Sequence, residues 1–525
     1  MGTQERGIFL RKASGVVRNV GAFDVFNYNL GMINIGIGIA YILLFGPAFY
    51  GGVDLVLGLL LVVMGVLPTA VGYYIFSITM PRSGGEYTFI SRGLNGVLGF
   101  VMSFDMVVWF MFYTGWSAGA MAYMGLSPFL QYLSSLTGRS DLSQMAVWFS
   151  GSTGFFLFGT GMIIFSAAVL IMGMKAYVRL NNIAVMIAVV GILLVIGLLF
   201  AGSREQFVAA LPAGSGGLQY DTVINKAVET GWAPAGGSLL GSMLWPYYPL
   251  AYSICSCVFS GEIKKVGRSQ LAGILGSLAF SAVLILLLIA GAYRTIGYDF
   301  LGAIGWNYYV NPAFSTPVIP WIGLLATMLT DNWVLATIVH LSFFLWAFFW
   351  VAGCMMYNTR AMLAWGLDRL MPARLGYVSP RFNTPVVATV ISAVVGVIFL
   401  AMFAFTDWLV TLVGDAGMVP TFIAVGLAMI TLPYVKKDVF QRSPANWRIA
   451  GIPVISLLGI ATVVFQVVMF WPFYTDPVGG AVALSARISA LAVPVTGFII
   501  YFAMREYRKR QGIKVELAFR EIPVE

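Results

Sequence analysis

Residues 32–44 read MINIGIGIAYILL, and with its flanks this stretch is long and apolar enough to cross a lipid bilayer. Two glycines, Gly36 and Gly38, lie at its centre. A glycine in a helix interior costs roughly 1 kcal/mol relative to alanine. Within a membrane, irregular backbone is tolerated only where it is buried in protein or lines a cavity. The stretch therefore predicts either a close approach of two helices or a functional interruption of one helix.

The composition indicates that such apolar stretches recur along the chain. Of the 525 residues, 59% are hydrophobic and 10% are charged, and the mean hydropathy is +0.88. Soluble domains carry about 25% charged residues, so the composition predicts a polytopic membrane protein. With about 20 apolar residues needed for each span, the sequence predicts twelve spans, roughly at 22–49, 53–79, 95–124, 146–174, 177–202, 234–260, 268–292, 332–364, 386–405, 408–433, 451–473 and 481–504.

The distribution of basic residues predicts the orientation in the membrane. If the N-terminus is inside, 25 of the 30 Lys and Arg residues fall in inner segments, and the five in outer loops are Arg139, Arg204, Lys226, Arg294 and Arg487. This asymmetry follows the positive-inside rule. It predicts a multi-pass protein of the cell membrane with cytoplasmic termini, and it explains the net charge of +9 without nucleic-acid binding. The polar, basic first 20 residues show no cleavable signal.

The sequence offers little support for enzyme chemistry. All three cysteines fall inside predicted spans, and Cys255 and Cys257 point to different faces of a helix. His340 is the only histidine, and no phosphate-binding loop GxxxxGK[ST] occurs. No His, Cys and acid constellation has catalytic spacing. We therefore expect no metal site, no cofactor and no catalytic residues.

The sixth predicted span contains a second interruption signal. Residues 242–262 read SMLWPYYPLAYSICSCVFSGE, with Pro246 and Pro249 at mid-membrane. Proline removes a backbone hydrogen bond and bends a helix. Interrupted helices at matching positions, five spans apart, point to an inverted repeat with a binding site at the midplane. The alternative is that the glycines serve tight packing and the prolines serve as simple kinks.

Three predicted inner loops carry motifs that resemble those of a known family. They read MPRSGGEYTFISRGLNGVLGF at 80–100, SGEIKKVGRSQLAGI at 260–274 and NTRAMLAWGLDRLMPARLGYVSPRFNTPVV at 358–387. In order and spacing they resemble the inner-loop motifs of the amino acid–polyamine–organocation (APC) superfamily, over about residues 20–440. The resemblance implies an all-α membrane protein with twelve transmembrane helices. These would form a five-plus-five inverted repeat, the LeuT-like fold, with helices 1 and 6 broken.

The same resemblance implies an organisation into two repeats with flanking segments. We expect a cytoplasmic N-terminal segment (1–21), a first repeat (22–202), an extracellular loop (203–233), a second repeat (234–433), two additional spans with their preceding loop (434–504) and a cytoplasmic tail (505–525).

The resemblance also implies a substrate site at the two breaks. Exposed N–H groups at a helix N-terminus attract a carboxylate, and free carbonyls at the other half-helix accept bonds from an ammonium. An amino acid zwitterion then needs no charged side chain from the protein. Matching the family pattern to this chain gives substrate-binding candidates at Ile35, Gly36, Ile37, Gly38, Trp245, Tyr248, Pro249, Leu250, Ala251, Tyr252 and Ser253.

Aromatic residues of spans three and eight are the candidates for side-chain specificity. These are Trp109, Tyr113, Thr114 and Trp346, with Phe343 and Trp350 beside them. Such a pocket favours a neutral substrate, whereas a cationic amino acid or a polyamine would use Asp105 or Asp415. An intramembrane acid is costly to insert, so both acids, together with Glu86 and Arg360 of the inner loops, are candidates for coupling or gating.

The coupling ion is the least determined feature. The position of the family's span-five lysine falls at Ala188, and no Ser or Thr lies between Phe343 and Tyr357 to bind sodium. Protons, exchange or uniport remain as mechanisms. The sequence thus predicts a secondary transporter of amino acids, whose partners are the substrate, the lipid bilayer and, in a coupled mechanism, protons. Alternatives are a polyamine or cationic amino-acid carrier, and a sensor of the same fold that binds without transport.

Overall fold

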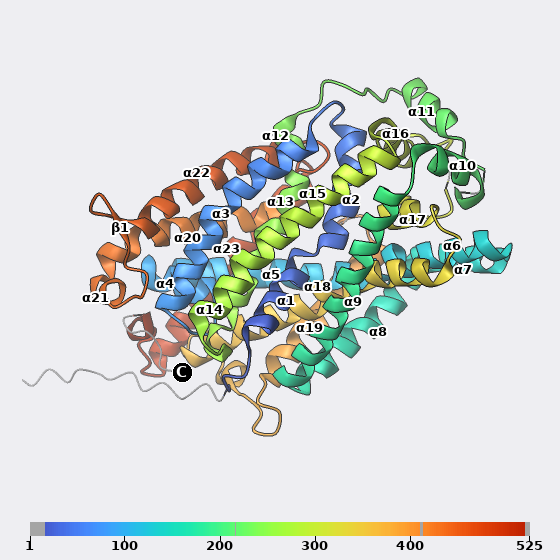
Figure 1. Cartoon of the computed structure of the whole chain (residues 1–525). Helices are drawn as coiled ribbons and strands as arrows, with labels where there is room; N and C mark the ends of the chain where they lie inside the picture. The colour runs from blue at the N-terminus through green and yellow to red at the C-terminus, as the bar shows by residue number, and fades with distance from the viewer. Residues whose placement is uncertain (1–15, 216, 315, 410–412, 520–525) are drawn as a thin grey trace, which may run out of the picture.

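The protein is a bundle of long helices, described here from a computed structural model (Figure 1). The structure describes residues 16–215, 217–314, 316–409 and 413–519. Most of the predicted N-terminal segment 1–21 and the last six residues of the predicted tail therefore lie outside the described residues. The only strands among the described residues are β1 (Arg448–Ile449) and β2 (Ile452–Pro453), which form a two-stranded antiparallel hairpin.

Eleven helical segments of the described chain are long and apolar enough to cross a membrane. In chain order they are α1 (Ala22–Ile33) with α2 (Ile35–Phe49), α3 (Leu55–Thr79), α5 (Gly96–Met121) continued by a π-helical turn (Ala122–Leu126) and α6 (Ser127–Thr137), α8 (Ser152–Ile171), α9 (Met174–Ala201), α14 (Val266–Gln270) continued through a π-helical turn (Leu271–Gly276) into α15 (Ser277–Thr295), α18 (Trp333–Leu367), α19 (Val386–Phe405), α20 (Gly414–Val435), α22 (Val454–Thr475) and α23 (Leu484–Arg510).

The predicted span 234–260 does not form one long helix. It is divided into α12 (Leu239–Ser242), α13 (Leu244–Leu250) and an eight-residue 3-10 helix, η2 (Ala251–Val258). The helical segment that begins in the predicted span 95–124 is longer than predicted, because it continues to Thr137. The remaining helices are short connections: α4 (Glu86–Gly93), α7 (Ser140–Ser150), α10 (Arg204–Ser215), α11 (Tyr220–Glu229), η3 (Ser260–Glu262), α16 (Tyr298–Val310), α17 (Ile322–Thr327), η5 (Ala373–Gly376), α21 (Lys437–Gln441) and η6 (Val515–Phe519).

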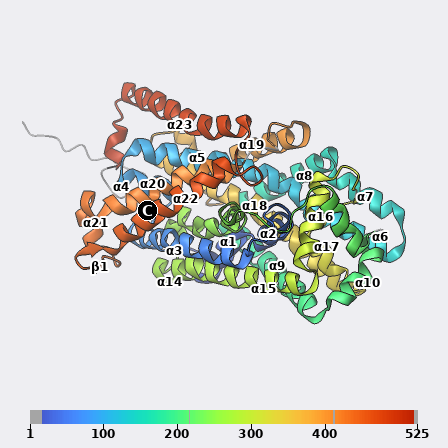
Figure 2. The same ribbon diagram turned by 90° about the horizontal axis from the view of Figure 1, so that it is seen from above.

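Burial separates central helices from peripheral ones. In the most apolar window of the α1–α2 segment 83% of residues are buried, compared with 17% in α23. Seen from above, α1, α2 and α18 lie in the middle of the bundle and α23 runs along its edge (Figure 2). Large apolar side chains of the outer helices are exposed, among them Met64, Leu157, Ile164, Leu491 and Ile499. This apolar outer surface suits a lipid environment, since a soluble monomer rarely exposes such extensive patches.

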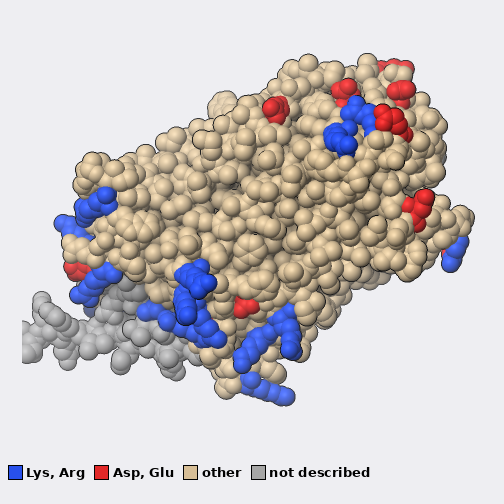
Figure 3. Space-filling view, viewed as in Figure 1, with Lys and Arg blue, Asp and Glu red and all other residues tan. Residues whose placement is uncertain are grey.

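Charged side chains gather at the two ends of the bundle. On the face shown in Figure 3, most Lys and Arg lie at the end that contains α21 and the start of α14. Most of the acidic side chains on this face lie at the opposite end, near α10 and α11. We call these the basic end and the acidic end. The long middle is almost free of charge on this face, as expected for the part of the surface in hydrocarbon.

Candidate functional site

The first membrane segment is interrupted at a single residue, Asn34. Asn34 has φ 58° and ψ 64°, a left-handed conformation, and separates α1 from α2. Asparagine tolerates this conformation better than other non-glycine residues because its short side chain bonds locally. Here its Oδ1 accepts a hydrogen bond from the backbone N–H of Ile37 at 3.2 Å, and its Nδ2 donates to the carbonyl of Trp346 at 2.8 Å. The side chain thus stabilises the start of α2 and ties it to α18.

The predicted sixth span, 234–260, departs from a regular α-helix over a longer stretch. Pro249 lies within α13 and lacks a backbone N–H, and the chain then continues as the 3-10 helix η2. Side chains replace part of the hydrogen bonding that an α-helix would supply. Asn29 of α1 accepts from the backbone N–H of Ser256 at 2.8 Å and donates to the Ser256 hydroxyl at 2.8 Å. That hydroxyl also bonds the Gln270 side chain at 2.6 Å.

A cavity of about 240 Å³ lies between the two interrupted segments. Its wall combines residues of the α1–α2 segment, α13, the acidic-end half of α5, α18, α19 and the start of α20, together with the connections before α20 and α23. The lining residues are Ile33, Asn34, Ile37, Gly38, Tyr41, Phe112, Tyr113, Trp116, Trp245, Tyr248, Pro249, Trp350, Phe403, Leu409, Val413, Asp415, Val478 and Gly479. A concave, mainly apolar space with a few polar groups is the usual form of a small-molecule site.

Stacked aromatic rings close one side of this cavity. The ring of Trp245 stacks on Phe45 with centroids 4.5 Å apart and on Tyr41 at 5.9 Å. Tyr41 also contacts Trp116 at 6.2 Å. Tyr248, one helical turn beyond Trp245, donates its hydroxyl to the carbonyl of Gly479. A ligand in the cavity would therefore lie against aromatic faces contributed by different segments of the chain.

One carboxyl group, Asp415 at the start of α20, is part of the cavity wall. It is buried and accepts hydrogen bonds from two tyrosines: from Tyr113, which also lines the cavity, and from Tyr252 at 2.5 Å, which lies behind the wall. Tyr252 belongs to η2 and Tyr113 to α5, so the acid links three segments around the cavity. The other candidate acid, Asp105, bonds Trp109 Nε1 at 3.0 Å and Thr421 at 3.3 Å and lies outside the cavity wall.

The structure places the predicted substrate residues in two groups. Ile37, Gly38, Trp245, Tyr248, Pro249 and Tyr113 line the cavity. Ile35, Gly36, Leu250, Ala251, Tyr252, Ser253, Trp109, Thr114 and Trp346 do not line it.

Gly36 shows why part of the prediction falls outside the cavity wall. A Cβ atom on Gly36 would lie 2.3 Å from Cδ1 of Trp346, so this glycine allows α2 to pack on α18. Gly38 differs, because it lines the cavity and also approaches the ring of Pro249, from which an added Cβ would be 2.9 Å away. The glycine motif therefore reflects close packing as well as the site, and the interruption itself lies at Asn34.

Several cavity residues carried no signal in the sequence. Asn34 precedes the glycine motif and is recognisable only as a residue that tolerates the left-handed conformation. Trp116 lies one turn beyond Tyr113 on α5, and a helical-face argument extended by one turn would have found it. Leu409, Val413, Val478 and Gly479 come from connections near the acidic end, whose position depends on the tertiary fold.

Two buried ion pairs join chain segments at the basic end. Arg360 of α18 donates to both carboxylate oxygens of Glu262, at 2.8 and 3.2 Å, and both side chains are almost fully buried. The backbone carbonyl of Glu262 accepts from the N–H groups of Asn19 and Val20 at 3.0 and 3.1 Å. This pair therefore joins the chain before α1, the end of the sixth segment and α18.

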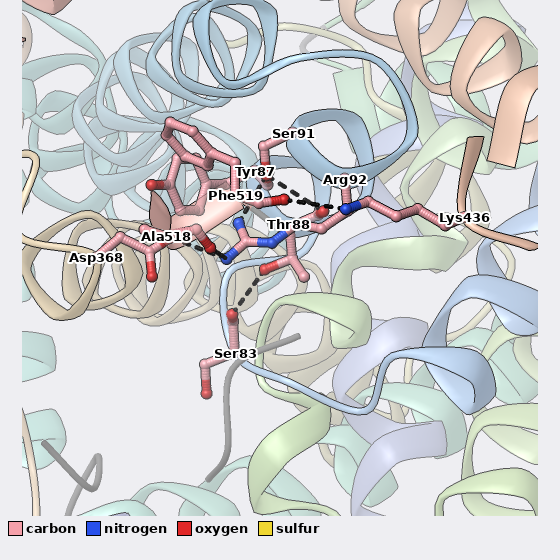
Figure 4. A network of polar contacts seen from close by, with 9 residues as sticks. All are labelled: Ser83, Tyr87, Thr88, Ser91, Arg92, Asp368, Lys436, Ala518 and Phe519. Atoms are coloured by element: carbon pink, nitrogen blue, oxygen red, sulfur yellow. Dashed lines mark hydrogen bonds and ion pairs between the residues drawn. The ribbon is translucent and has the colours of Figure 1, made fainter. Parts of the chain in front are cut away.

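The second ion pair involves Arg92 of α4 and the tail of the chain (Figure 4). Arg92 donates to Asp368 at 3.1 Å and to the carbonyl of Ala518 at 3.0 Å. The guanidinium carbon of Arg92 lies 5.6 Å from the centre of the Phe519 ring and 5.8 Å from the centre of the Tyr87 ring. The C-terminal segment thus packs into the basic end beside α4 and the end of α18.

Glu86, the first residue of α4, has a different environment. It is fully buried and accepts a hydrogen bond from the Tyr357 hydroxyl, with the Cys257 thiol 3.9 Å away. Its position follows from two glycines with positive φ, Gly84 and Gly85, which bring the loop against the sixth segment and α18. Among the described residues, no arginine forms an ion pair with Glu86. Burial raises the pKa of the Glu86 carboxyl above its ordinary value.

Within the described part of the chain, no cluster of three or more His, Cys, Asp or Glu side chains could hold a metal ion.

Comparison with known proteins shows that almost the whole chain is similar to one protein family. A family model described as amino acid permease matches residues 21–503. The branched-chain amino acid permease BcaP of Bacillus subtilis is 26% identical over 455 residues, which cover 86% of this chain and 87% of that protein. The methylthioribose transporter of the same organism is 22% identical over 89% of this chain and 90% of its own. BcaP of Lactococcus lactis is 23% identical over 88% and 90%.

Proposed function

The chain belongs to the amino acid permease family of the APC superfamily, and on this premise we propose that it is a secondary transporter that moves amino acids across the cell membrane by alternating access. Its family and relatives are permeases, so it is a membrane transporter protein and not an enzyme. The observation that carries the proposal is the cavity between the two interrupted segments, whose wall contains the N-terminus of α2 and the C-terminal part of α13.

These two helix ends suit the two charges of an amino acid. The helix dipole at the N-terminus of α2 favours a carboxylate, and the Asn34 side chain already bonds the Ile37 N–H there. At the end of α13 the hydrogen bonding changes to the 3-10 pattern of η2, and a carbonyl there, which has two lone pairs, can accept a further bond from an ammonium. The carboxylate would lie near Asn34 and Ile37, and the ammonium near Pro249.

The proposed architecture is the twelve-span, five-plus-five inverted repeat. In it residues 22–202 and 234–433 form the two repeats, the segment divided at η2 counts as the sixth span, and residues 434–504 add the last two spans. The basic end then faces the cytoplasm with both termini, as the positive-inside rule requires. In this arrangement the buried ion pairs of Arg360 and Arg92 would form a closed gate on the cytoplasmic side of the cavity.

A neutral side chain suits most of the cavity, whose wall is aromatic and aliphatic apart from Asn34, Asp415 and tyrosine hydroxyls. Both oxygens of Asp415 already accept tyrosine hydrogen bonds. The names of two relatives, branched-chain amino acid permeases, agree with an apolar substrate.

A second candidate is a carrier of cationic amino acids or polyamines. The observation that favours it is the position of Asp415 in the cavity wall, surrounded by aromatic rings that also attract cations. In this case Asp415 would bind the cationic group, and replacement by asparagine would abolish recognition of the cation.

Uptake into proteoliposomes tests both candidates. Labelled leucine, arginine and putrescine would be offered with an imposed proton gradient, a sodium gradient or none. The proposal predicts saturable uptake or exchange of leucine without sodium dependence, and little effect of Asp415→Asn. Preference for arginine or putrescine that is lost in Asp415→Asn would establish the second candidate. Saturable binding without uptake or exchange would contradict transport and favour a sensor.

A further inference from the structure

Two buried glutamates at the basic end have contrasting partners. Glu262 is bonded to the guanidinium of Arg360 through both of its oxygens, so its negative charge is compensated. Glu86 is equally buried, with 0% of its surface exposed, but its contacts are a phenol and a thiol. A buried carboxylate without a compensating cation is costly, so Glu86 is most stable there in the protonated form.

The groups around Glu86 leave its charge uncompensated among the described residues. The titratable side chains that face it are Tyr73 from α3, Cys255 and Cys257 from η2, and Tyr357 from α18. None of them carries a positive charge at any pH. The Tyr357 hydroxyl donates to the carboxyl group and partly offsets the effect of burial on its pKa.

Closure of the basic end is what buries Glu86. The backbone N–H of Gly84 bonds the carbonyl of Val258 at 2.8 Å, and a Cβ on Gly85 would lie 3.0 Å from Cys257 Sγ. A separation of this loop from η2 and α18 would admit water to the carboxyl group. Its pKa would then fall toward the ordinary value near 4.3, and it would ionise at neutral pH.

The same 3-10 helix connects Glu86 with the cavity. Near its first residue, Tyr252 bonds Asp415 in the cavity wall, and near its last, Cys257 lies against Glu86. A second connection passes through ring contacts: Tyr357 to Phe110 at 4.5 Å, and Phe110 to Tyr252 at 5.6 Å. A displacement of η2 that accompanies substrate release would therefore act directly on the contacts of Glu86.

We propose that Glu86 is the proton-binding residue of the cytoplasmic gate: it holds a proton while the gate is closed and releases it to the cytoplasm when the gate opens. The proton moves from the carboxyl oxygen to water on opening and returns from water to the carboxylate on closing. Because a proton is bound only in the closed form, low pH favours closure and high pH favours opening. This inference rests on the proposed alternating-access cycle, but its test requires no substrate.

The test follows alkylation of Cys257 by N-ethylmaleimide in the full-length protein in lipid nanodiscs. Mass spectrometry of peptides would locate the label among the three buried cysteines, from about pH 5.5 to about pH 8.5. The variant Glu86→Gln keeps the shape of the side chain but cannot ionise. It also corrects for the faster reaction of any thiol at high pH, since Cys257 is the same in both proteins.

The wild-type labelling rate, divided by that of Glu86→Gln, is expected to rise at least about tenfold across this range. Glu506→Gln, which removes an exposed carboxyl near the same end, should behave like the wild type. A ratio that stays constant with pH would overturn the inference, as would a Cys257 that is never labelled in either protein.

A second variant keeps the inference testable if Glu86→Gln does not fold. Tyr357→Phe removes the hydrogen bond that favours the ionised carboxyl group, so the midpoint of the labelling curve should move to higher pH. A purely structural role of Glu86 would leave this midpoint unchanged, and that result would contradict the inference. Loss of transport in the uptake assay with an intact labelling curve would instead contradict the proposed function alone.

Discussion

The first membrane segment and the predicted sixth span, 234–260, border the same cavity, but their backbones are interrupted in different ways. In the first, one left-handed residue, Asn34, separates two regular helices. In the sixth, η2 replaces two turns of α-helix over eight residues, and side chains of neighbouring helices bond its backbone. One side chain therefore maintains the first interruption, whereas the second depends on tertiary contacts. The first should be sensitive to a single substitution and the second should be more tolerant.

The largest effect is expected for Asn34→Leu. Leucine would have to adopt the left-handed conformation at a cost of about 1–2 kcal/mol. It would also lose the two bonds to Ile37 and Trp346, worth about 1 kcal/mol each. The free energy of unfolding should fall by about 3–4 kcal/mol in total, which thermal unfolding in detergent would measure. Asn34→Gly accepts the backbone conformation and should lose only about half as much; equal losses in both variants would contradict the single-residue account.

A smaller effect is expected for Gly36→Ala, which tests whether this glycine is needed for the packing of α2 on α18 and not for the interruption at Asn34. The new Cβ would lie 2.3 Å from the Trp346 ring, and such overpacking typically costs about 1–3 kcal/mol. The control is Gly161→Ala in α8, where nothing lies within 4 Å of the added Cβ. The control should be stabilised by up to about 1 kcal/mol through helix propensity. Similar melting temperatures for both variants would show that α2 does not pack closely on α18.

Asn29→Ala tests whether tertiary contacts maintain η2. It removes both bonds to Ser256 and leaves a buried backbone N–H without that partner, at a cost of about 1–2 kcal/mol. Hydrogen exchange measured by mass spectrometry should become faster in 251–258 and remain unchanged in α23. Unchanged exchange in η2 would mean that its conformation is intrinsic to the sequence.

The smallest effect is expected for Pro249→Ala. The lost packing of the proline ring on Gly38 is offset by the better helix propensity of alanine, so stability should change by less than about 1 kcal/mol. If η2 is maintained by Asn29 and Gln270, its hydrogen exchange should also stay close to that of the wild type. A strong slowing would show that Pro249 alone causes the interruption.

Much of the fold could be predicted from hydrophobicity. Eleven of the predicted spans coincide with long apolar helices, because about 20 apolar residues have no alternative in a membrane. The sixth was recognisable from its prolines, but the extent of the 3-10 helix was not, since it depends on Asn29 and Gln270. The sequence pointed to Gly36 as the first interruption, whereas the structure places it two residues earlier, at Asn34. The reason is that a glycine predicts flexibility and close packing equally well.

The site was predictable to a smaller extent, for a related reason. Trp245, Tyr248 and Pro249 follow from the position of the interruption along the chain. Whether an aromatic residue of α5 or α18 faces the cavity depends on the rotation of that helix against its neighbours. Trp109 thus faces Asp105 and Gly417, while Tyr113, one turn later, faces the cavity.

The most direct test of the central claim measures substrate binding after the cavity is filled. Ile37 lines the cavity, so Ile37→Trp should occupy space needed by an amino acid, whereas Ile164→Trp on the lipid-facing surface of α8 adds the same bulk elsewhere. Equilibrium binding of labelled leucine to the two purified variants would be compared with that of the wild type. We expect at least about tenfold weaker binding for Ile37→Trp, a loss of about 1.4 kcal/mol, and an unchanged Kd for Ile164→Trp. Unaltered leucine binding by a folded Ile37→Trp variant would show that the substrate does not bind between the two interrupted segments.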